Sequence, residues 1–201
     1  MFIDEMNLDQ MNLDQMHISQ FSYSDCRIKL AVDDWELQQA QALRKAVFVV
    51  EQGIFQTSDH DVFDSSAYTL VATIGLLGIP DAVVGTVRIH EQAPGVWVGS
   101  RLAVDQAYRS VKGLGKALIA MAVSSARAQG CTAFYANVQL PNVGLFQKLG
   151  WQALGEASVH GVQHMFMQAN LDMYPVEHDP GRGFIHLFKQ PSSKARIERR
   201  V

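Results

Sequence analysis

The pattern of apolar and polar positions changes from period two to helical spacing several times along the chain, which predicts a mixture of strands and helices. Residues 27–32 alternate as a strand, and Asp33 or Asp34 is suited to cap the helix that follows as far as Val47, before Gly53. A second run repeats its apolar residues at 118, 119, 122, 123 and 126 and is closed by Gly130, which predicts a helix over 116–129. A short helix is expected over 142–149.

The other apolar runs are strand-like, with β-branched residues and turn residues between them. They cover 67–77, 82–90, 96–104 and 131–140, with two more around Gly161. The expected order is strand, helix, three strands, helix, strand, helix and two strands. One strand, helix, strand crossover within an antiparallel meander predicts an α/β (α+β) fold with a mixed, mostly antiparallel sheet of about seven strands.

Composition indicates one folded domain between two charged arms. The 201 residues are 48% hydrophobic and 18% charged, with a net charge of −3. We expect a flexible acidic N-terminal arm over 1–25, in which MNLDQ occurs twice, a domain over 26–175, and a C-terminal extension over 176–201 with a basic tail. The opposite charges of the arms make a homodimer through arm exchange conceivable.

Charge and cysteine usage limit the function classes. The near-neutral balance disfavours nucleic acid and acidic membranes as partners. Acids at the N-terminus do not fit a secretory signal, and the longest apolar stretch is too short for a bilayer, so we expect a cytoplasmic protein without membrane contact. Cys26 and Cys131 have no zinc spacing, and the aspartates at 59, 61 and 64 do not follow a calcium loop, so no metal is expected.

The run VWVGSRLAVDQAYRSVKGLGKA, residues 96–117, is the most informative one for function. It leads from an apolar strand into a helix that begins at Gly113 and Gly115, flanked by Lys112 and Lys116. Glycines let a phosphate approach the backbone, and the helix N-terminus stabilises its negative charge. Arg109 and the two lysines are suited to add charge-assisted contacts.

This run, followed about 25 residues later by NVGLFQKLGW, resembles the two signature segments of the GNAT superfamily of acyl-CoA-dependent N-acyltransferases. The resemblance covers roughly residues 27–171. It implies a GNAT-like fold with helices on both faces of the sheet, a splay between two central parallel strands, and acetyl-CoA or another acyl-CoA as co-substrate. It also implies an acyltransferase that transfers an acyl group, most simply acetyl, to a primary amine by direct attack.

The resemblance implies a set of residues that bind the coenzyme. The backbone of the strand binds the pantetheine arm, the glycine loop binds the pyrophosphate, and the second segment faces the coenzyme. Carried across, these are Leu102, Ala103 and Val104, then Arg109, Lys112, Gly113, Leu114, Gly115 and Lys116, and finally Asn142 and Phe146. Ser110 stands where the family has Arg or Gln, which indicates a loop one residue longer. Phe146 stands where a proton-donating Tyr is common, so another acid, a water or none is required.

The segments LRKAVFVVEQG, DHDVFDSSAYTL, VVGTVRI and SRLAV are similar to acyl-homoserine-lactone synthases, a branch of the same fold. The match falls on Asp61, Asp64, Arg88, Ser100 and Arg101; the last three are candidates for binding the substrate. Val98 replaces a glutamate of that branch, so the general base is unassigned. Its candidates are Asp61, Asp64, His90 and Glu91, although both aspartates are equally suited to pair with Arg44 or Arg88.

Three functions remain open at this point. The first is acyl transfer to a small-molecule or peptidyl amine, and the second is a noncatalytic acyl-CoA sensor, suggested by Phe146 and Val98. The third is a lactone synthase that uses an acyl carrier and S-adenosylmethionine.

Overall fold

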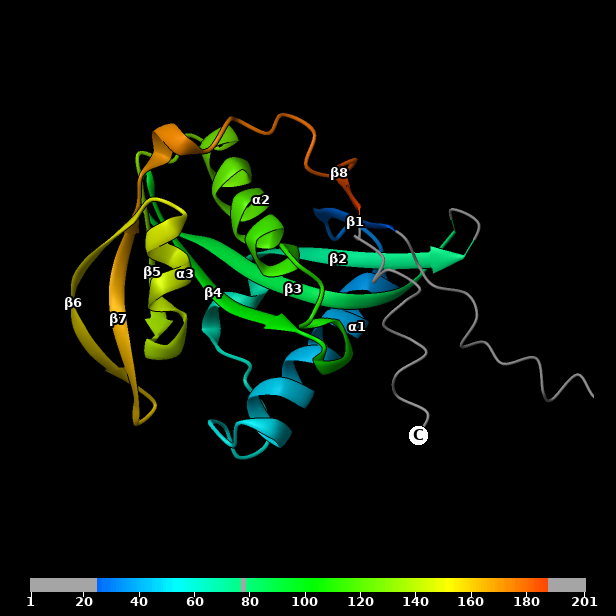
Figure 1. The fold of residues 1–201 in the computed structure, drawn as a ribbon, viewed down its shortest axis with the longest axis horizontal. Helices are drawn as coiled ribbons and strands as arrows, with labels where there is room; N and C mark the ends of the chain where they lie inside the picture. Colours follow the sequence, from blue (N-terminus) through cyan, green and yellow to red (C-terminus); the bar gives the residue numbers. More distant parts are fainter. Residues whose placement is uncertain (1–24, 77–78, 188–201) are drawn as a thin grey trace, which may run out of the picture.

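The computed structural model describes residues 25–76 and 79–187. One eight-stranded sheet runs through this part in the order β6-β7-β5-β4-β3-β2-β1-β8 (Figure 1). The strands are β1 Asp25–Leu30, β2 Tyr68–Leu76, β3 Ile79–Ala93, β4 Val96–Val104, β5 Ala133–Gln139, β6 Trp151–Val159, β7 Val162–Ala169 and β8 Phe184–Leu187. Neighbouring strands are antiparallel except β4 and β5. The predicted mixed sheet is confirmed.

The sheet has one strand more than the seven expected. Phe184–Leu187 pairs with β1 as β8, so the sheet continues into the C-terminal extension. Most of the expected acidic arm and the basic tail from 189 onward lie outside the described residues.

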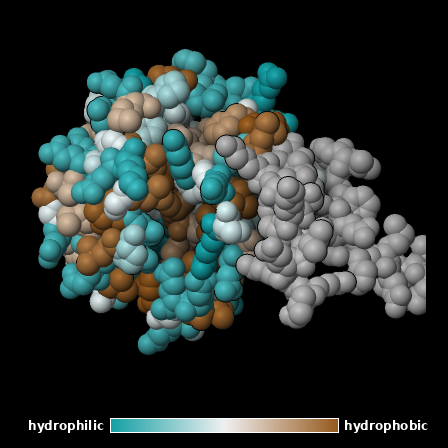
Figure 2. Space-filling model, in the orientation of Figure 1, coloured by the Kyte–Doolittle hydropathy of each residue, from teal (hydrophilic) through white to brown (hydrophobic). Residues whose placement is uncertain are grey.

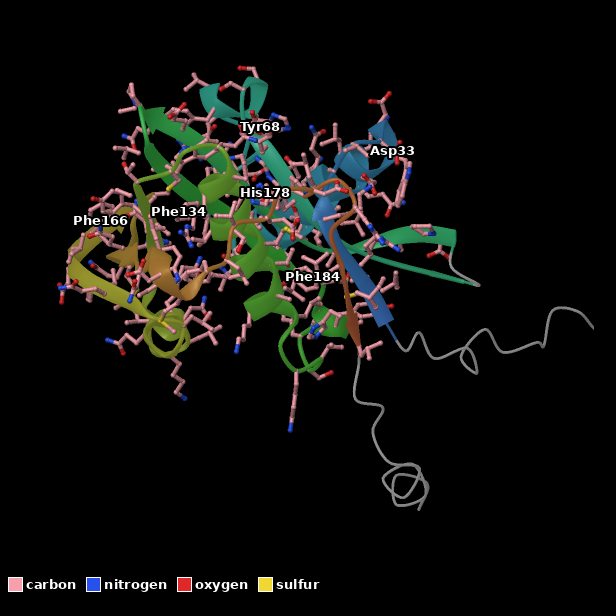
Figure 3. The ribbon with its side chains drawn as sticks, turned by 90° about the horizontal axis from the view of Figure 1, so that it is seen from above. Asp33, Tyr68, Phe134, Phe166, His178 and Phe184 are labelled. Carbon is pink, nitrogen blue, oxygen red and sulfur yellow. The ribbon has the colours of Figure 1, made fainter. Side chains whose placement is uncertain are left out.

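In the described part of the chain, three α-helices cover the sheet: α1 Asp34–Arg44, α2 Leu114–Ala128 and α3 Val143–Lys148. Alternate residues of a strand point to opposite faces, and the two apolar cores follow this alternation. Val71 packs with α1 residues in one core, whereas Leu70 and Ala72 pack with α2 and α3 residues in the other. Helices therefore lie on both faces, with α1 on one (the α1 face) and α2 and α3 on the other (the α2 face); Figure 3 shows this arrangement from above.

The expected helix over residues 34–47 changes character partway. It continues from α1 as a π-helix over Lys45–Glu51, in which Gln52 N–H donates to Val47 O at 2.9 Å. π-Helical turns often lie at functional sites because the extra residue turns side chains onto a new face. Here the segment buries Phe48 against the sheet and leads into the loop over 52–61.

Short 3-10 turns complete the described chain, at Val62–Ser65, Gln106–Tyr108, Leu140–Asn142 and Leu171–Met173. Among the described residues, no helix is long and apolar enough to cross a membrane. The surface in Figure 2 mixes hydrophilic and hydrophobic side chains and has an apolar hollow near its centre.

Candidate functional site

The central strands separate halfway along their length. β4 and β5 pair in parallel from Val96 with Ala133 to Gly99 with Ala136, and the pairing ends there. Immediately afterwards β4 carries a bulge, since Thr86 pairs with Ala103 but Arg88 pairs with Ser100. Arg101 lies in this bulge with a φ of 55°, a left-handed conformation that is uncommon for a residue with a side chain. The β4 edge beyond Gly99 therefore has backbone groups with no partner on β5.

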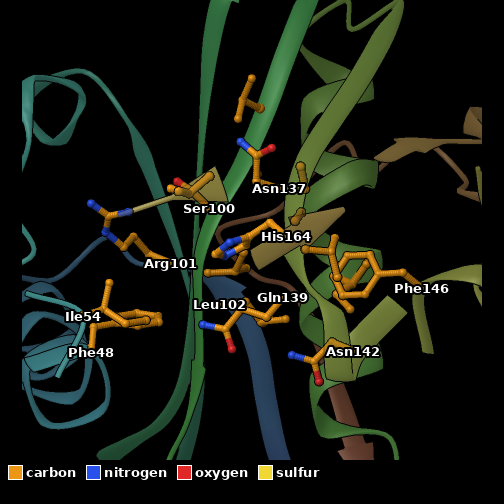
Figure 4. Close-up of a pocket in the computed structure, with 18 of the residues that line it drawn as sticks. Phe48, Ile54, Ser100, Arg101, Leu102, Asn137, Gln139, Asn142, Phe146 and His164 are labelled. Atoms are coloured by element: carbon orange, nitrogen blue, oxygen red, sulfur yellow. The ribbon is translucent and has the colours of Figure 1, made fainter. Parts of the chain in front are cut away.

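A cavity of about 240 Å³ occupies the gap between the two strands (Figure 4). On the α2 face its wall is mainly apolar and includes Ile119, Ala122, Phe134, Phe146 and Trp151. Phe146 is buried and meets Trp151 edge to face, with ring centroids 5.0 Å apart.

The part of the cavity on the α1 face is more polar. Ser100, Arg101, Asn137, Gln139 and His164 line it. Asn137 and Gln139 alternate along β5 with Ala136 and Val138, which pack in the core beneath α2, so these amides point to the opposite face. The cavity thus connects the two faces of the sheet through the splay.

Two aromatic residues border the cavity on the α1 side. Phe55, in the loop after the π-helix, lies with its ring centroid 4.6 Å from that of His160 at the β6–β7 turn. The Arg101 guanidinium lies over the same phenyl ring, 4.8 Å from its centroid. Gln139 also donates to Gln52 at 3.0 Å, which connects β5 to this loop.

An arginine–aspartate cluster holds the segment over 59–64 against the sheet. Arg88 donates to both Asp61 oxygens at 2.7 and 2.8 Å and to Ser100 Oγ at 3.0 Å. The three positive and three negative members neutralise one another: Arg44, Arg88, Arg101, Asp59, Asp61 and Asp64.

The cluster also changes the titration of its carboxylates. The hydrogen bond from Arg88 holds the pKa of Asp61 below its ordinary value. For Asp64, burial alone would raise the pKa, but the hydrogen bonds from Arg44 and the Asp61 N–H bring it well below the usual range. Both groups are therefore carboxylates near neutral pH, and both are already paired with arginine.

The four candidates for the general base are not among the residues that line the cavity: Asp61, Asp64, His90 and Glu91. His90 is buried, its ring stacks on Phe63 at 4.2 Å, and desolvation followed by the Arg88 charge lowers its pKa. Glu91 is exposed and accepts a hydrogen bond from Gly95 N–H at the β3–β4 turn. Their role as base remains a prediction without a contact to the cavity.

The expected substrate-binding residues meet in space. Ser100 and Arg101 line the cavity, while Arg88 is buried behind Ser100. Of the expected coenzyme residues, Leu102, Asn142 and Phe146 line the cavity, and Ala103 and Val104 continue β4. Lys112 and the glycines lie where α2 begins. Gly113 has a φ of 89° at the N-cap, which fits the requirement for glycine there.

The start of α2 has features that fit an anionic group. No side chain of the described residues caps the helix by a hydrogen bond, and the first-turn N–H groups of Gly115 and Lys116 have no partner within the helix. A Cβ at Gly115 would have no neighbour within 4 Å. Arg109, however, is engaged elsewhere: it donates to Val104 O at 3.0 Å and to both Glu51 oxygens at 2.6 Å.

Sequence reasoning did not assign His164 to the site. It considered the spacing of His160 and His164 only as a zinc motif, and among the described residues no group of three or more potential ligands gathers for a metal. The signal that was available is the alternation along β7, which places His164 on the opposite face from Met165 and Met167.

Comparisons with known proteins agree with this geometry. The model of the acetyltransferase (GNAT) family matches residues 28–151. A Bacillus subtilis (strain 168) protein provisionally described as an acetyltransferase is 29% identical over 147 residues, which cover 70% of this chain and 93% of the relative.

Solved structures give the same result for the fold. A crystal structure from Lactobacillus plantarum, provisionally described as an N-acetyltransferase, has a TM-score of 0.65 at 27% identity and covers 73% of this chain and 98% of that one. BjaI, a CoA-dependent acyl-homoserine lactone synthase, has a TM-score of 0.58 at 20% identity over 71% and 82% of the two chains. Because the family model spans more than half of its residues, the chain belongs to the GNAT acetyltransferase family.

Proposed function

We propose that this protein transfers an acyl group, most simply acetyl, from acyl-CoA to the primary amine of a small molecule or peptide by direct attack. The observation that carries the proposal is the cavity through the β4–β5 splay. It gives a thioester on the α2 face and an amine on the α1 face a common meeting point. Holding two reactants in one such space replaces a bimolecular encounter by a positioned one.

The coenzyme half of the proposal uses the α2 face. The uncapped start of α2 suits the pyrophosphate, and Lys112 and Lys116 add positive charge. The free β4 edge at Leu102 to Val104 suits the amides of the pantetheine arm, which needs hydrogen-bond partners as an added strand would. Asn142 and Phe146 border the same path from the opposite side.

The chemical step needs stabilisation of the oxyanion that forms when the amine attacks the thioester. Backbone N–H groups near the β4 bulge are fixed donors that need no rearrangement during the reaction. Phe146 has no hydroxyl group, so in this chain it serves as an apolar wall and not as the acid for the leaving sulfur.

A second candidate is a synthase related to BjaI. It is favoured by the contacts among Asp61, Arg88, Ser100 and Arg101, the residues on which the lactone-synthase resemblance fell. It predicts a lactone product from S-adenosylmethionine and an acyl donor. Mass spectrometry of the products separates the candidates, because direct transfer to the amines of a panel gives linear amides only.

The first experiment measures by calorimetry how strongly acyl-CoA binds to the wild type, to Gly115→Asp and to the control variant Gly155→Asp. Gly115→Asp places a carboxylate in the first turn of α2, in open space and at an ordinary backbone conformation. The helix dipole stabilises a negative side chain at this end of the helix, so we expect the variant to fold. The added carboxylate repels the negatively charged pyrophosphate. Gly113→Asp is less suitable, because its side chain would meet His186 and its φ is positive.

Gly155→Asp in β6 is the matched control, since it adds the same charge in open space away from α2. We expect wild type and Gly155→Asp to bind one acetyl-CoA per chain and Gly115→Asp to bind at least tenfold more weakly. Equal affinities in folded variants contradict the loop assignment. If the wild type does not bind acetyl-CoA at millimolar concentration, the proposed acyltransferase function is wrong.

A further inference from the structure

The cavity contains few groups that can accept a proton. Among the described residues, no aspartate or glutamate lines it, and the titratable side chains there are Arg101, His160 and His164. A guanidinium stays protonated at all relevant pH values, whereas a histidine ring exchanges a proton near neutrality. Of the described residues that line this cavity, the two histidines are therefore the candidates for a base.

His164 is held in a defined orientation. It lies in β7 between Gln139 of β5 and Ala157 of β6, and only 8% of its surface is exposed. Its Nδ1 lies 2.8 Å from the Val162 carbonyl oxygen. A carbonyl only accepts hydrogen bonds, so Nδ1 carries the hydrogen, and in the neutral ring the lone pair is on Nε2.

The Nε2 atom is left available for a substrate. Among the described residues, the ring makes the hydrogen bond to Val162 and no other. Figure 4 shows the ring near the centre of the cavity, in the gap between β4 and β5. A neutral imidazole oriented by a backbone carbonyl and open at Nε2 has the arrangement required of a general base.

His160 differs in each of these respects. It is exposed at the β6–β7 turn, has a φ of 51°, and contacts Phe55 with its ring face tilted. It borders the entrance, whereas His164 lies inside.

We propose that His164 is the catalytic base for the acyl transfer, an inference that rests on the proposed function. The nitrogen lone pair of the amine forms the new C–N bond, and the proton on that nitrogen passes to His164 Nε2. The C–S bond then breaks, and the proton passes from the imidazolium to the coenzyme sulfur. The products are the amide and free coenzyme A thiol, and the ring returns to its neutral form.

The amine gives up two protons in the whole reaction, and the second one passes to His164. A free primary amine has a pKa of about 10.4 and is mainly an ammonium ion in water, so it loses one proton to the solvent before its nitrogen lone pair attacks. Among the described residues, no carboxylate lines the cavity to hold the ammonium form. The neutral amine is therefore the form that attacks, and His164 takes the second proton, which the nitrogen gives up as the C–N bond forms.

The test compares His164→Asn with His160→Asn. Asparagine retains a side-chain N–H for the Val162 carbonyl but has no basic nitrogen, and at 160 it tolerates the left-handed backbone. Thiol release from acetyl-CoA is first measured for wild type on a panel of primary amines, and the variants are then assayed with the best amine. Thermal melting and acetyl-CoA calorimetry accompany each variant.

We expect His164→Asn to bind acetyl-CoA with a Kd within about twofold of wild type while kcat falls by about 10²-fold, the usual contribution of a general base. His160→Asn should lower kcat much less than His164→Asn does, because its ring lies at the border of the cavity and is not held by a backbone carbonyl. His164→Ala, which leaves space for a small base, should regain activity when imidazole is added. Rescue by imidazole distinguishes a lost base from a lost structural contact.

Two results overturn the inference for different reasons. If wild type binds acetyl-CoA and releases thiol but His164→Asn keeps a wild-type kcat, the base is not His164 while the proposed function stands. If wild type neither binds acetyl-CoA nor releases thiol with any amine, the proposed function fails and the inference fails with it.

Discussion

Arg109 and Glu51 form a two-bond ion pair, with both N–O distances at 2.6 Å, that joins the loop before α2 to the end of the π-helix. The hydrogen bond from Arg109 lowers the pKa of Glu51, so the carboxylate is ionised at neutral pH. Arg109 is also the residue that the sequence predicts to contact a phosphate. This prediction therefore places Glu51 and the pyrophosphate in competition for one guanidinium.

We predict that Glu51→Gln binds acyl-CoA more tightly than wild type. Removing the carboxylate charge frees Arg109 for the pyrophosphate, and an exposed ion pair of this kind corresponds to a gain of about two- to fivefold in affinity. Calorimetry at low and high salt measures the effect, which should shrink as salt screens the charges. Glu156→Gln in β6 is the control. Weaker binding by Glu51→Gln would show instead that Glu51 positions Arg109 for the ligand.

Much of the fold follows from local pattern because its elements are continuous and well patterned. Val96–Val104 occurs with the predicted bounds, since its turn residues and β-branched positions define both ends. β8 was missed because four residues next to Gly183 are too short to show alternation. The π-helix was missed because the residues after Arg44 continue the apolar spacing of α1. The spacing of apolar residues does not show whether the backbone hydrogen bonds are those of an α-helix or of a π-helix.

The site was less predictable than the fold for a physical reason. The sequence identified Asp61 and Asp64 as bases or as arginine partners, and the distances show that arginines already engage both. The sequence shows that these residues are aspartates, but only the tertiary structure determines which arginines they pair with. The place of His164 in the site depends on its hydrogen bond to the Val162 carbonyl and on the separation of β4 from β5. Neither feature can be read from the residue type.

The Arg88–Asp61 pair predicts an acid-labile site. Because the folded-state pKa of Asp61 is depressed, its stabilising contribution is present above the unfolded pKa of about 3.9 and is lost as the pH falls through the folded value. We expect Asp61→Asn to be less stable than wild type at pH 7 and to show a flatter decline in Tm below about pH 5. Asp81→Asn, whose carboxylate pairs with no arginine among the described residues, should follow wild type. Parallel declines for all three proteins would contradict this role.

His90 predicts a second pH dependence at higher pH. Desolvation, assisted by Arg88, lowers its folded-state pKa, so between the two pKa values the unfolded chain binds a proton that the folded protein does not. Stability therefore falls as the pH decreases below about 6.5. His90→Phe, which keeps a ring against Phe63, should have a Tm that changes less between pH 7.5 and 5.5. His160→Asn is the control. If Tm of His90→Phe changes with pH as much as that of the wild type, groups other than His90 cause the pH dependence.

Gly99, in the last β4–β5 pair, packs closely against Phe134 in the wall of the cavity, and this packing can be tested. A Cβ at Gly99 would lie 2.9 Å from Phe134 Cε1, so an added methyl group forces the buried phenyl ring to move. Gly99→Ala should lower the free energy of unfolding by about 1–3 kcal/mol, the usual cost of overpacking, and weaken acyl-CoA binding because Phe134 lines the cavity. Combining it with Phe134→Leu should recover part of both losses, because the smaller side chain makes room. Urea unfolding and calorimetry of the two single variants and the double variant give the coupling, and strictly additive losses would show that the two residues do not interact.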